Sequence, residues 1–257
     1  MAERPLPVFI TGASRGIGAA TARHFARGGH PVALVARTAS ALEALAKEIN
    51  DAGGKAVAIP CDVADAEAVK RAVERAVAAL GGLGIVVNDA GTLAPVGPLV
   101  DTPPAEWARA IAINLCGPMH VMHYAIPHLL RGGVVINITS GAAQAPIYGW
   151  TTYCASKAAL MITSRIVQIE EGKKRGIRVV ALSPGMVDTE MYAYNRAHRD
   201  GREPSDGTED LRPPAEVAQI IAWVASAGAD ECAGKVVSAR DPDFRRRAGV
   251  PPLADSR

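Results

Sequence analysis

A serine, a tyrosine and a lysine lie close together between residues 139 and 157. Tyr153 and Lys157 are four positions apart in a predicted helix, so both side chains lie on one face of it. A tyrosine hydroxyl has a pKa of about 10, and a nearby lysine ammonium favours the phenolate and lowers that pKa. Ser140 follows an apolar segment, at the sheet edge where open α/β proteins bind ligands. Two interpretations remain open: a proton-transfer site, or a capped strand end beside an amphipathic helix.

Short runs rich in valine and isoleucine predict the elements that would position these residues. Their lack of polar alternation is typical of strands buried on both faces of a parallel sheet. Amphipathic segments separate them, with a capping-box spacing at Ser40 and Glu43 and a predicted cap at Asp65. We therefore expect an α/β doubly wound parallel sheet of about seven strands with helices on both faces. The predicted strands are 7–11, 31–36, 55–60, 84–88, 133–139, 177–183 and 234–239.

The pattern predicts one domain over residues 1–257. No internal repeat or linker divides the chain. Residues 192–212 are polar and rich in glycine and proline, which predicts a long loop on the substrate side. Residues 244–257 are expected to form an exposed C-terminal tail.

Composition narrows the partners and the compartment. The formal net charge is +2, and the three arginines at 245–247 fall in the predicted tail, so no nucleic-acid partner is expected. No signal peptide and no membrane-length apolar run is present. The four cysteines are widely spaced, so neither a metal site nor a disulfide framework is expected. The default is a cytoplasmic protein.

A glycine-rich turn follows the first predicted strand and precedes a helix. Gly12, Gly16 and Gly18 have the spacing G-x-x-x-G-x-G. Glycines at this position let the backbone approach a pyrophosphate, which binds at the positive N-terminus of the helix. The motif alone is compatible with a purely structural turn, but its place after the first strand of an α/β pattern favours dinucleotide binding.

The end of the second predicted strand indicates which dinucleotide binds. An acidic residue there would bind the ribose hydroxyls of NAD, whereas an arginine accommodates the extra phosphate of NADP. This chain has Arg37 at that point, and Arg15 in the glycine turn supplies a second guanidinium. The sequence therefore predicts NADP(H) as the cofactor.

Several motifs together resemble the short-chain dehydrogenase/reductase family. They are "TGASRGIG", "NDAG", Asn114, Ser140, "YCASK" and "PGMVDT", in the family's order and spacing, and the match is close over residues 7–190. The resemblance implies a Rossmann-type fold that transfers a hydride between a nicotinamide and a carbonyl or alcohol carbon. It implies that Tyr153 is the general acid/base, Lys157 lowers its pKa and holds the nicotinamide ribose, Ser140 orients the substrate oxygen, and Asn114 supports a proton-relay water.

The resemblance also implies the cofactor contacts. The phosphate turn would contain Gly12, Ser14, Arg15, Gly16, Ile17 and Gly18, with Arg37 beside it. Asp62 and Val63 would meet the adenine, and Asn88, Ala90 and Gly91 would line the ribose side. Pro184, Gly185, Val187 and Thr189 would lie beside the nicotinamide, with Thr189 near the carboxamide.

Two positions depart from a regular pattern. Pro118 cannot donate to the carbonyl of Asn114, which predicts a bent helix with that carbonyl left free, either to bind water or merely to allow packing. Position 89 is an aspartate where the family more often has asparagine. An ionised Asp89 accepts hydrogen bonds but does not donate them, which puts its local contacts in the sheet in question.

A narrower resemblance concerns the substrate. "YGWTTYCASKAAL", "IEEG" and "PGMVDTEM" are similar to the sepiapterin reductase and benzil reductase branch, which reduces vicinal dicarbonyl compounds with NADPH. Sepiapterin reductases anchor the pterin with an aspartate near the C-terminus, where this chain has Ser238, so a ketone or 1,2-diketone is favoured over a pterin. An apolar substrate pocket is expected from Trp150, Met186, Met191 and Tyr192.

Other functions stay open at this point. They are a 3-oxoacyl-thioester reductase, an alcohol dehydrogenase, and a non-catalytic NADP-binding sensor. The helices that end in "YAIPHLL" and "IVQIEEG" are those that the family uses to associate, which implies a homodimer or homotetramer.

Overall fold

The computed structural model describes residues 5–198 and 211–253. Seven parallel strands form one sheet in the order β3-β2-β1-β4-β5-β6-β7, which confirms the predicted doubly wound α/β fold. The order reverses between β1 and β4, so the crevice beside these two strands is the expected ligand site. The strands are β1 (Val8–Thr11), β2 (Val32–Ala36), β3 (Ala56–Pro60), β4 (Leu83–Asn88), β5 (Leu129–Ile138), β6 (Arg178–Ser183) and β7 (Val236–Ser238).

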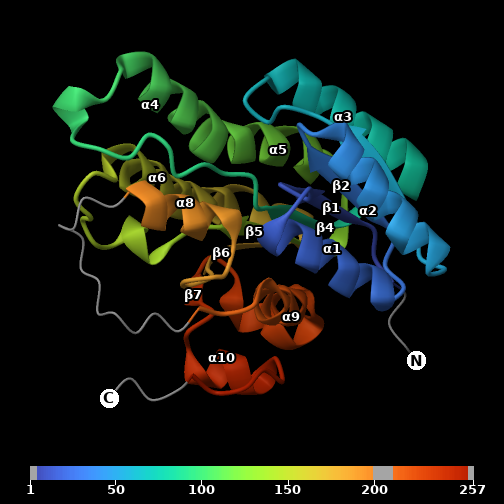
Figure 1. Ribbon diagram of the computed structural model, residues 1–257. Helices are drawn as coiled ribbons and strands as arrows, with labels where there is room; N and C mark the ends of the chain where they lie inside the picture. Colours follow the sequence, from blue (N-terminus) through green and yellow to red (C-terminus); the bar gives the residue numbers. More distant parts are fainter. Residues whose placement is uncertain (1–4, 199–210, 254–257) are drawn as a thin grey trace.

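Helices cover both faces of this sheet (Figure 1). The α-helices are α1 (Gly16–Arg27), α2 (Ala39–Asp51), α3 (Ala66–Leu80), α4 (Pro104–Ile111), α5 (Gly117–Ala125), α6 (Thr151–Val167), α7 (Lys173–Arg175), α8 (Glu190–His198), α9 (Pro214–Ala225) and α10 (Pro242–Arg247). Two π-helical segments, η2 (Ala112–Cys116) and η5 (Gln168–Gly172), extend α4 and α6. Short 3-10 turns occupy Leu99–Asp101, Ile126–His128, Gly141–Ala143 and Ala227–Cys232.

The core consists of two apolar layers, one on each side of the sheet. Ile10 of β1 faces the layer shared with α1, α2 and α9, whereas its neighbour Phe9 faces the layer shared with α3 and α5. Both side chains are fully buried. Because successive strand residues point to opposite faces and both faces are covered, the strands are apolar at almost every position.

Local capping agrees with the sequence in one helix and differs in another. The Asp65 carboxylate accepts hydrogen bonds from the backbone N–H groups of Glu67 and Ala68, as predicted. The predicted cap at Ser40 is wrong, because α2 begins two residues earlier, at Ala39, with Thr38 as its N-cap residue. Ser40 therefore lies inside the first turn of the helix.

Two segments predicted to be irregular are partly helical. Residues 190–198, which overlap the predicted loop 192–212, form α8; residues 199–210 lie outside the described part of the chain. The predicted tail 244–257 is wrong at its start, because α10 continues to Arg247 and packs on α9 (Figure 1). The sequence pattern missed both helices because each is short and polar and is stabilised by packing rather than by its own periodicity.

Arg245 attaches this C-terminal helix to the domain. Its side chain is 2% exposed and forms an ion pair of 2.7 Å with Glu216 of α9. It also donates to the carbonyl oxygens of Pro251 and Ala239. The neighbouring Arg246 is exposed and pairs with Asp243. The three arginines thus have different surroundings and do not form one solvated cluster.

No helix in the described ranges is long and apolar enough to cross a membrane.

The Arg245 contacts predict a measurable contribution to stability. Replacing Arg245 with methionine leaves Glu216 and two carbonyl oxygens without their buried donor, so the free energy of unfolding should fall by about 3 kcal/mol. Urea denaturation followed by far-UV circular dichroism measures this change. Arg246→Met is the matched control, and its effect should stay within about 0.5 kcal/mol. Equal losses in the free energy of unfolding for the two substitutions would show that the buried ion pair stabilises the fold no more than the exposed one.

Candidate functional site

A cavity of about 520 Å³ opens at the carboxyl ends of β1, β2 and β4, where the strand order reverses. Its lining includes eleven of the predicted cofactor residues: Gly12, Ser14, Arg15, Gly16, Ile17, Arg37, Asp62, Val63, Ala90, Gly91 and Thr189. Sequence reasoning did not single out seven other residues that line it: Ala36, Thr38, Ala41, Cys61, Thr92, Ile113 and Glu190. Cys61 could have been predicted as a lining residue, because it follows β3 and immediately precedes the predicted Asp62.

The glycine turn is held close to the segment that follows β4. Gly12 has a φ of +72°, and a Cβ there would lie 2.8 Å from the backbone nitrogen of Ala90. The Thr11 hydroxyl accepts hydrogen bonds from the N–H groups of Asp89 and Ala90, both at 3.1 Å. A Cβ on Gly18 would lie 2.5 Å from the Gly12 carbonyl oxygen. Glycine is therefore required at these positions for close backbone packing, which is how a dinucleotide turn is built.

The N-terminus of α1 faces this cavity. Arg15 is the N-cap residue and provides no side-chain cap, and the first turn contains no acidic residue. The first N–H groups of a helix lack intrahelical partners and carry partial positive charge, so they suit an anion. Gly18, in contrast, is buried behind the turn and contributes packing rather than a surface of the cavity.

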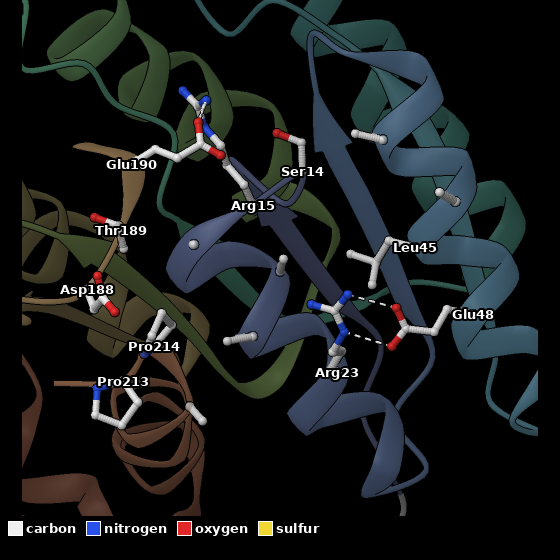
Figure 2. Close-up of a pocket in the computed structure, with 16 residues that line it drawn as sticks. Ser14, Arg15, Arg23, Leu45, Glu48, Asp188, Thr189, Glu190, Pro213 and Pro214 are labelled. Carbon is white, nitrogen blue, oxygen red and sulfur yellow. Dashed lines mark hydrogen bonds and ion pairs between the residues drawn. The ribbon is translucent and has the colours of Figure 1, made fainter. Parts of the chain in front are cut away.

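The two arginines predicted to bind a phosphate, Arg15 and Arg37, both line this cavity. Arg37 is exposed at the end of β2, and Arg15 forms an ion pair with Glu190 of α8 (Figure 2). A neighbouring cavity of about 750 Å³ lies behind the turn, where Arg23 and Glu48 form paired hydrogen bonds of 2.7 Å (Figure 2). Arg15 and Glu190 line both cavities. Glu190 is therefore an unexpected neighbour of the predicted phosphate site.

The residues predicted to lie beside the ribose and the nicotinamide do not share one environment. Asn88 has a buried side chain that donates to Asn137 at 2.8 Å, within the sheet rather than in the cavity. Val187 is 5% exposed and belongs to the core, whereas Thr189 reaches the cavity. Pro184 is buried and Gly185 takes a φ of +74° beside it.

Arg212, which the sequence did not single out, connects residues 184–188 to the segment just before α9 through backbone hydrogen bonds. Its backbone N–H donates to the Met186 carbonyl at 3.1 Å, and its carbonyl accepts from the N–H of Asp188 at 2.9 Å. The φ of +74° at Gly185 favours glycine, and a Cβ there would also lie 2.5 Å from the guanidinium of Arg212. Residues 184–188 are thus fixed by a residue that lies far along the chain.

Ser140, Tyr153 and Lys157 converge at the carboxyl end of β5. The Tyr153 hydroxyl is hydrogen-bonded to Ser140, whose Oγ also accepts from the Ala142 N–H at 3.2 Å. Lys157 Nζ donates to the Ile138 carbonyl at 2.8 Å and lies 5.7 Å from the centroid of the Tyr153 ring. The three side chains that the sequence placed together are together in the structure.

Burial sets the pKa values of this group. It raises the pKa of Tyr153 to about 12; the hydrogen bond from Ser140 opposes this change, and the charge of Asp89 adds to it. It lowers the pKa of Lys157 to about 8, and Asp89 opposes that change. Desolvation of the phenol outweighs the hydrogen bond from Ser140, so the net change in the pKa of Tyr153 is upward, and the predicted effect of Lys157 on that pKa stays a prediction.

Asn114 lies at the π-helical segment between α4 and α5. The N–H of Gly117 bonds to the carbonyl of Ala112, five residues back, which confirms the predicted distortion near Pro118. The Asn114 amide both donates to and accepts from the backbone of Thr92, each at 2.8 Å. It also donates to Ser156 Oγ at 3.2 Å, and Ser156 donates to the Tyr153 carbonyl. The side chain therefore connects the cavity wall to the helix that carries Tyr153.

An apolar cluster surrounds Tyr153 on the side away from the glycine turn. The Trp150 ring meets the Tyr153 ring edge-on, with centroids 5.5 Å apart. Met191 belongs to this cluster as predicted, but the α8 aromatic in it is Tyr194 rather than Tyr192. Met186 is half-buried outside the cluster. The residues missed by the sequence are Leu93, Val96, Ala142, Ile147 and Cys154.

Known proteins show the same architecture. The family model of the short chain dehydrogenases matches residues 7–200. A short-chain dehydrogenase/reductase from Cladobotryum, FrzI, is 34% identical over 90% of this chain and 92% of its own length. The cis-4-hydroxycyclohexanecarboxylate dehydrogenase of Sinomonas cyclohexanicum is 33% identical over 89% of this chain and 92% of its own. The structure of a short chain dehydrogenase from Burkholderia cenocepacia in complex with NADP has a TM-score of 0.80 and 31% identity, over 91% of this chain and 95% of that one.

A doubly wound sheet with a glycine turn at its switch point and a Ser-Tyr-Lys group beside it defines a Rossmann-type oxidoreductase. The chain belongs to the short-chain dehydrogenase family.

Proposed function

We propose that the protein is an NADPH-dependent carbonyl reductase that acts on a ketone or a 1,2-diketone, with Tyr153 as the general acid. The observation that carries this proposal is the convergence of Ser140, Tyr153 and Lys157 next to the cavity that Arg37 lines. A Cβ on Gly91, which also lines that cavity, would lie 3.7 Å from Lys157 Nζ. A non-catalytic sensor is less well supported, because a binding module has no use for a buried proton donor hydrogen-bonded to a serine.

The described residues fit a nicotinamide dinucleotide. Close packing at Gly12 and Gly18 lets the backbone approach a pyrophosphate, and the N-cap residue of α1, Arg15, makes no side-chain cap hydrogen bond. Asp62 and Val63 would meet the adenine, and Thr189 would hold the nicotinamide end. Lys157, whose Nζ lies 3.7 Å from the position of a Cβ on Gly91, would hold the nicotinamide ribose. When bound there, the reduced cofactor supplies the hydride.

The residues of the chain would manage the substrate oxygen and its proton. The Ser140 hydroxyl would donate a hydrogen bond to the carbonyl oxygen and fix its orientation. The Tyr153 hydroxyl would donate its proton to the same oxygen as charge develops there. The Lys157 ammonium would stabilise the phenolate that remains. The apolar cluster around Trp150 would exclude water from the reacting carbon.

The substrate class is proposed from the sequence resemblance and from this cluster. Trp150, Met191 and Tyr194 offer apolar and aromatic surface that suits a hydrophobic ketone or diketone. Ser238 provides no charge to anchor a pterin. An alcohol dehydrogenase is the second candidate, favoured by the relative that acts on a hydroxylated cyclohexane ring according to its name. Reduction of a 3-oxoacyl thioester in the same assay would identify the protein as a 3-oxoacyl-thioester reductase.

Two further observations support the proposed compartment and the proposed domain organisation. All four cysteines lie in the described residues and are free thiols, which suits a reducing compartment such as the cytoplasm. All seven strands belong to one sheet, which favours one cofactor-binding domain over residues 1–257.

Replacement of Tyr153 with phenylalanine tests the chemistry. It should lower kcat with benzil or another 1,2-diketone by roughly 10²- to 10⁴-fold, because the proton donor is lost while the ring packing remains. NADPH oxidation at 340 nm measures the rate, and NADPH fluorescence measures binding. Tyr124→Phe, on α5, is the control and should keep its activity. Wild-type protein that binds NADPH but reduces no ketone, diketone or oxoacyl thioester would favour the sensor.

Replacement of Arg37 with methionine tests the cofactor preference. The guanidinium would form charge-assisted hydrogen bonds with the extra phosphate of NADPH, so its loss should weaken NADPH binding by roughly tenfold. NADH binding should change little. Titrations of both cofactors, with the exposed Arg27→Met as control, give the two dissociation constants. Equal losses for NADPH and NADH would exclude Arg37 as the phosphate-binding residue.

We propose that α6 forms a homodimer interface, within either a dimer or a tetramer. Ile162, Ile166 and Ile169 repeat at helical spacing and are 50%, 45% and 81% exposed. Met119 of α5 is also exposed. Such an apolar stripe is typical of a surface covered by a partner, and a two-fold axis would pair it with itself.

Charge placed on this stripe should separate the subunits. Ile166→Glu combined with Ile169→Glu should reduce the sedimentation coefficient to that of a monomer at micromolar concentration, because two like charges would be buried against their symmetry mates. Val100→Glu, at an exposed apolar position outside α5 and α6, is the control. A wild-type protein that already sediments as a monomer would contradict the proposed interface.

A further inference from the structure

Asp89 occupies an unusual place between the glycine turn and the catalytic helix. It follows β4 and lines the cofactor cavity. Its carboxylate accepts a hydrogen bond from the Gly18 N–H in the first turn of α1. A Cβ on Gly18 would lie 3.0 Å from Asp89 Oδ2, so the glycine allows this approach. The carboxyl group is thus fixed against the helix that would bind the pyrophosphate.

The same carboxyl group acts on the proton-bearing residues of α6. Its charge raises the pKa of Lys157 and also raises the pKa of Tyr153. Lys157 lies next to the segment that carries Asp89, since a Cβ on Gly91 would lie 3.7 Å from Lys157 Nζ and 3.8 Å from the Asp89 carbonyl oxygen. An asparagine at position 89 could accept the same Gly18 hydrogen bond but would carry no charge.

The groups that face this site come from three elements. From β1, the Thr11 hydroxyl accepts the Asp89 N–H; from α1, the Gly18 N–H binds the carboxylate; and from α6 come the Lys157 ammonium and the Tyr153 phenol. The Cys154 thiol also raises the pKa of Tyr153. Burial raises the pKa of Asp89 to about 7, while Lys157 and the Gly18 hydrogen bond oppose that change.

We propose that Asp89 is a positioning residue whose negative charge keeps Tyr153 and Lys157 protonated to higher pH, and so keeps the proton donor loaded. This inference rests on the proposed reduction with Tyr153 as the general acid. A negative charge disfavours the phenolate and favours the ammonium, so both groups hold their protons longer. The hydrogen bond to Gly18 fixes the distance over which this charge acts.

The direction of the effect follows for the Asp89→Asn variant. Without the carboxylate, the pKa of Tyr153 falls because its phenolate is no longer repelled. The pKa of Lys157 falls too because its ammonium loses an attractive charge. Reduction needs the proton on Tyr153 and the charge on Lys157, so both changes move the alkaline loss of activity to lower pH. The two effects add rather than cancel.

The pH profile of kcat provides the first test. In Asp89→Asn, the alkaline limb of ketone reduction should move down by about one pH unit. Asp62→Asn is the matched control, because it removes another carboxylate from the same cavity without acting on Lys157, and its alkaline limb should stay in place. An Asp89→Asn profile that superimposes on the wild type after scaling would assign Asp89 a purely structural role and overturn the proposal.

A second measurement does not depend on turnover. The ¹³Cε chemical shifts of labelled lysines report protonation, and the Lys157 signal is assigned by its absence in Lys157→Arg. The midpoint for Lys157 should fall by about one pH unit in Asp89→Asn and remain unchanged in Asp62→Asn. An unchanged midpoint in Asp89→Asn would refute the electrostatic role. Because no substrate is present, failure of the proposed reductase activity leaves this result interpretable.

Discussion

The arrangement of the site depends on how closely the glycine turn approaches the segment after β4. Thr11 binds the backbone of Asp89 and Ala90, and Gly12 and Gly18 leave no room for a side chain between the two segments. This contact joins β1, α1 and β4 at the point where the strand order reverses. The cavity and the N-terminus of α1 keep their relative positions because the backbones meet here directly.

Much of this arrangement could be predicted from the sequence. The strands were recognisable because burial on both faces leaves continuous apolar runs, as in β4 and β6. The glycine turn and the Tyr153–Lys157 pair were recognisable because a close backbone approach and a shared helix face each require fixed spacing. These features are local, and local spacing is what a sequence displays.

The remaining features depend on contacts between distant residues. The pKa of Tyr153 is set by desolvation, which no spacing reveals. Arg245 resembled a solvated residue because its partner Glu216 lies 29 positions away. Tyr194 rather than Tyr192 joins the apolar cluster around Tyr153 because the orientation of α8 decides which side chain points inward. Asn88 matched the family motif, yet its side chain turned into the sheet toward Asn137.

The ion pair between Arg15 and Glu190 has a consequence for how the two ends of the site communicate. Both side chains are about two-thirds exposed, so the pair contributes little free energy and its partners exchange readily. A phosphate that engages Arg15 would release Glu190, the first residue of α8, and the next residue is Met191 of the apolar cluster around Tyr153. Since linkage between sites is reciprocal, a substrate that displaces Met191 would alter the affinity for that phosphate by the same factor.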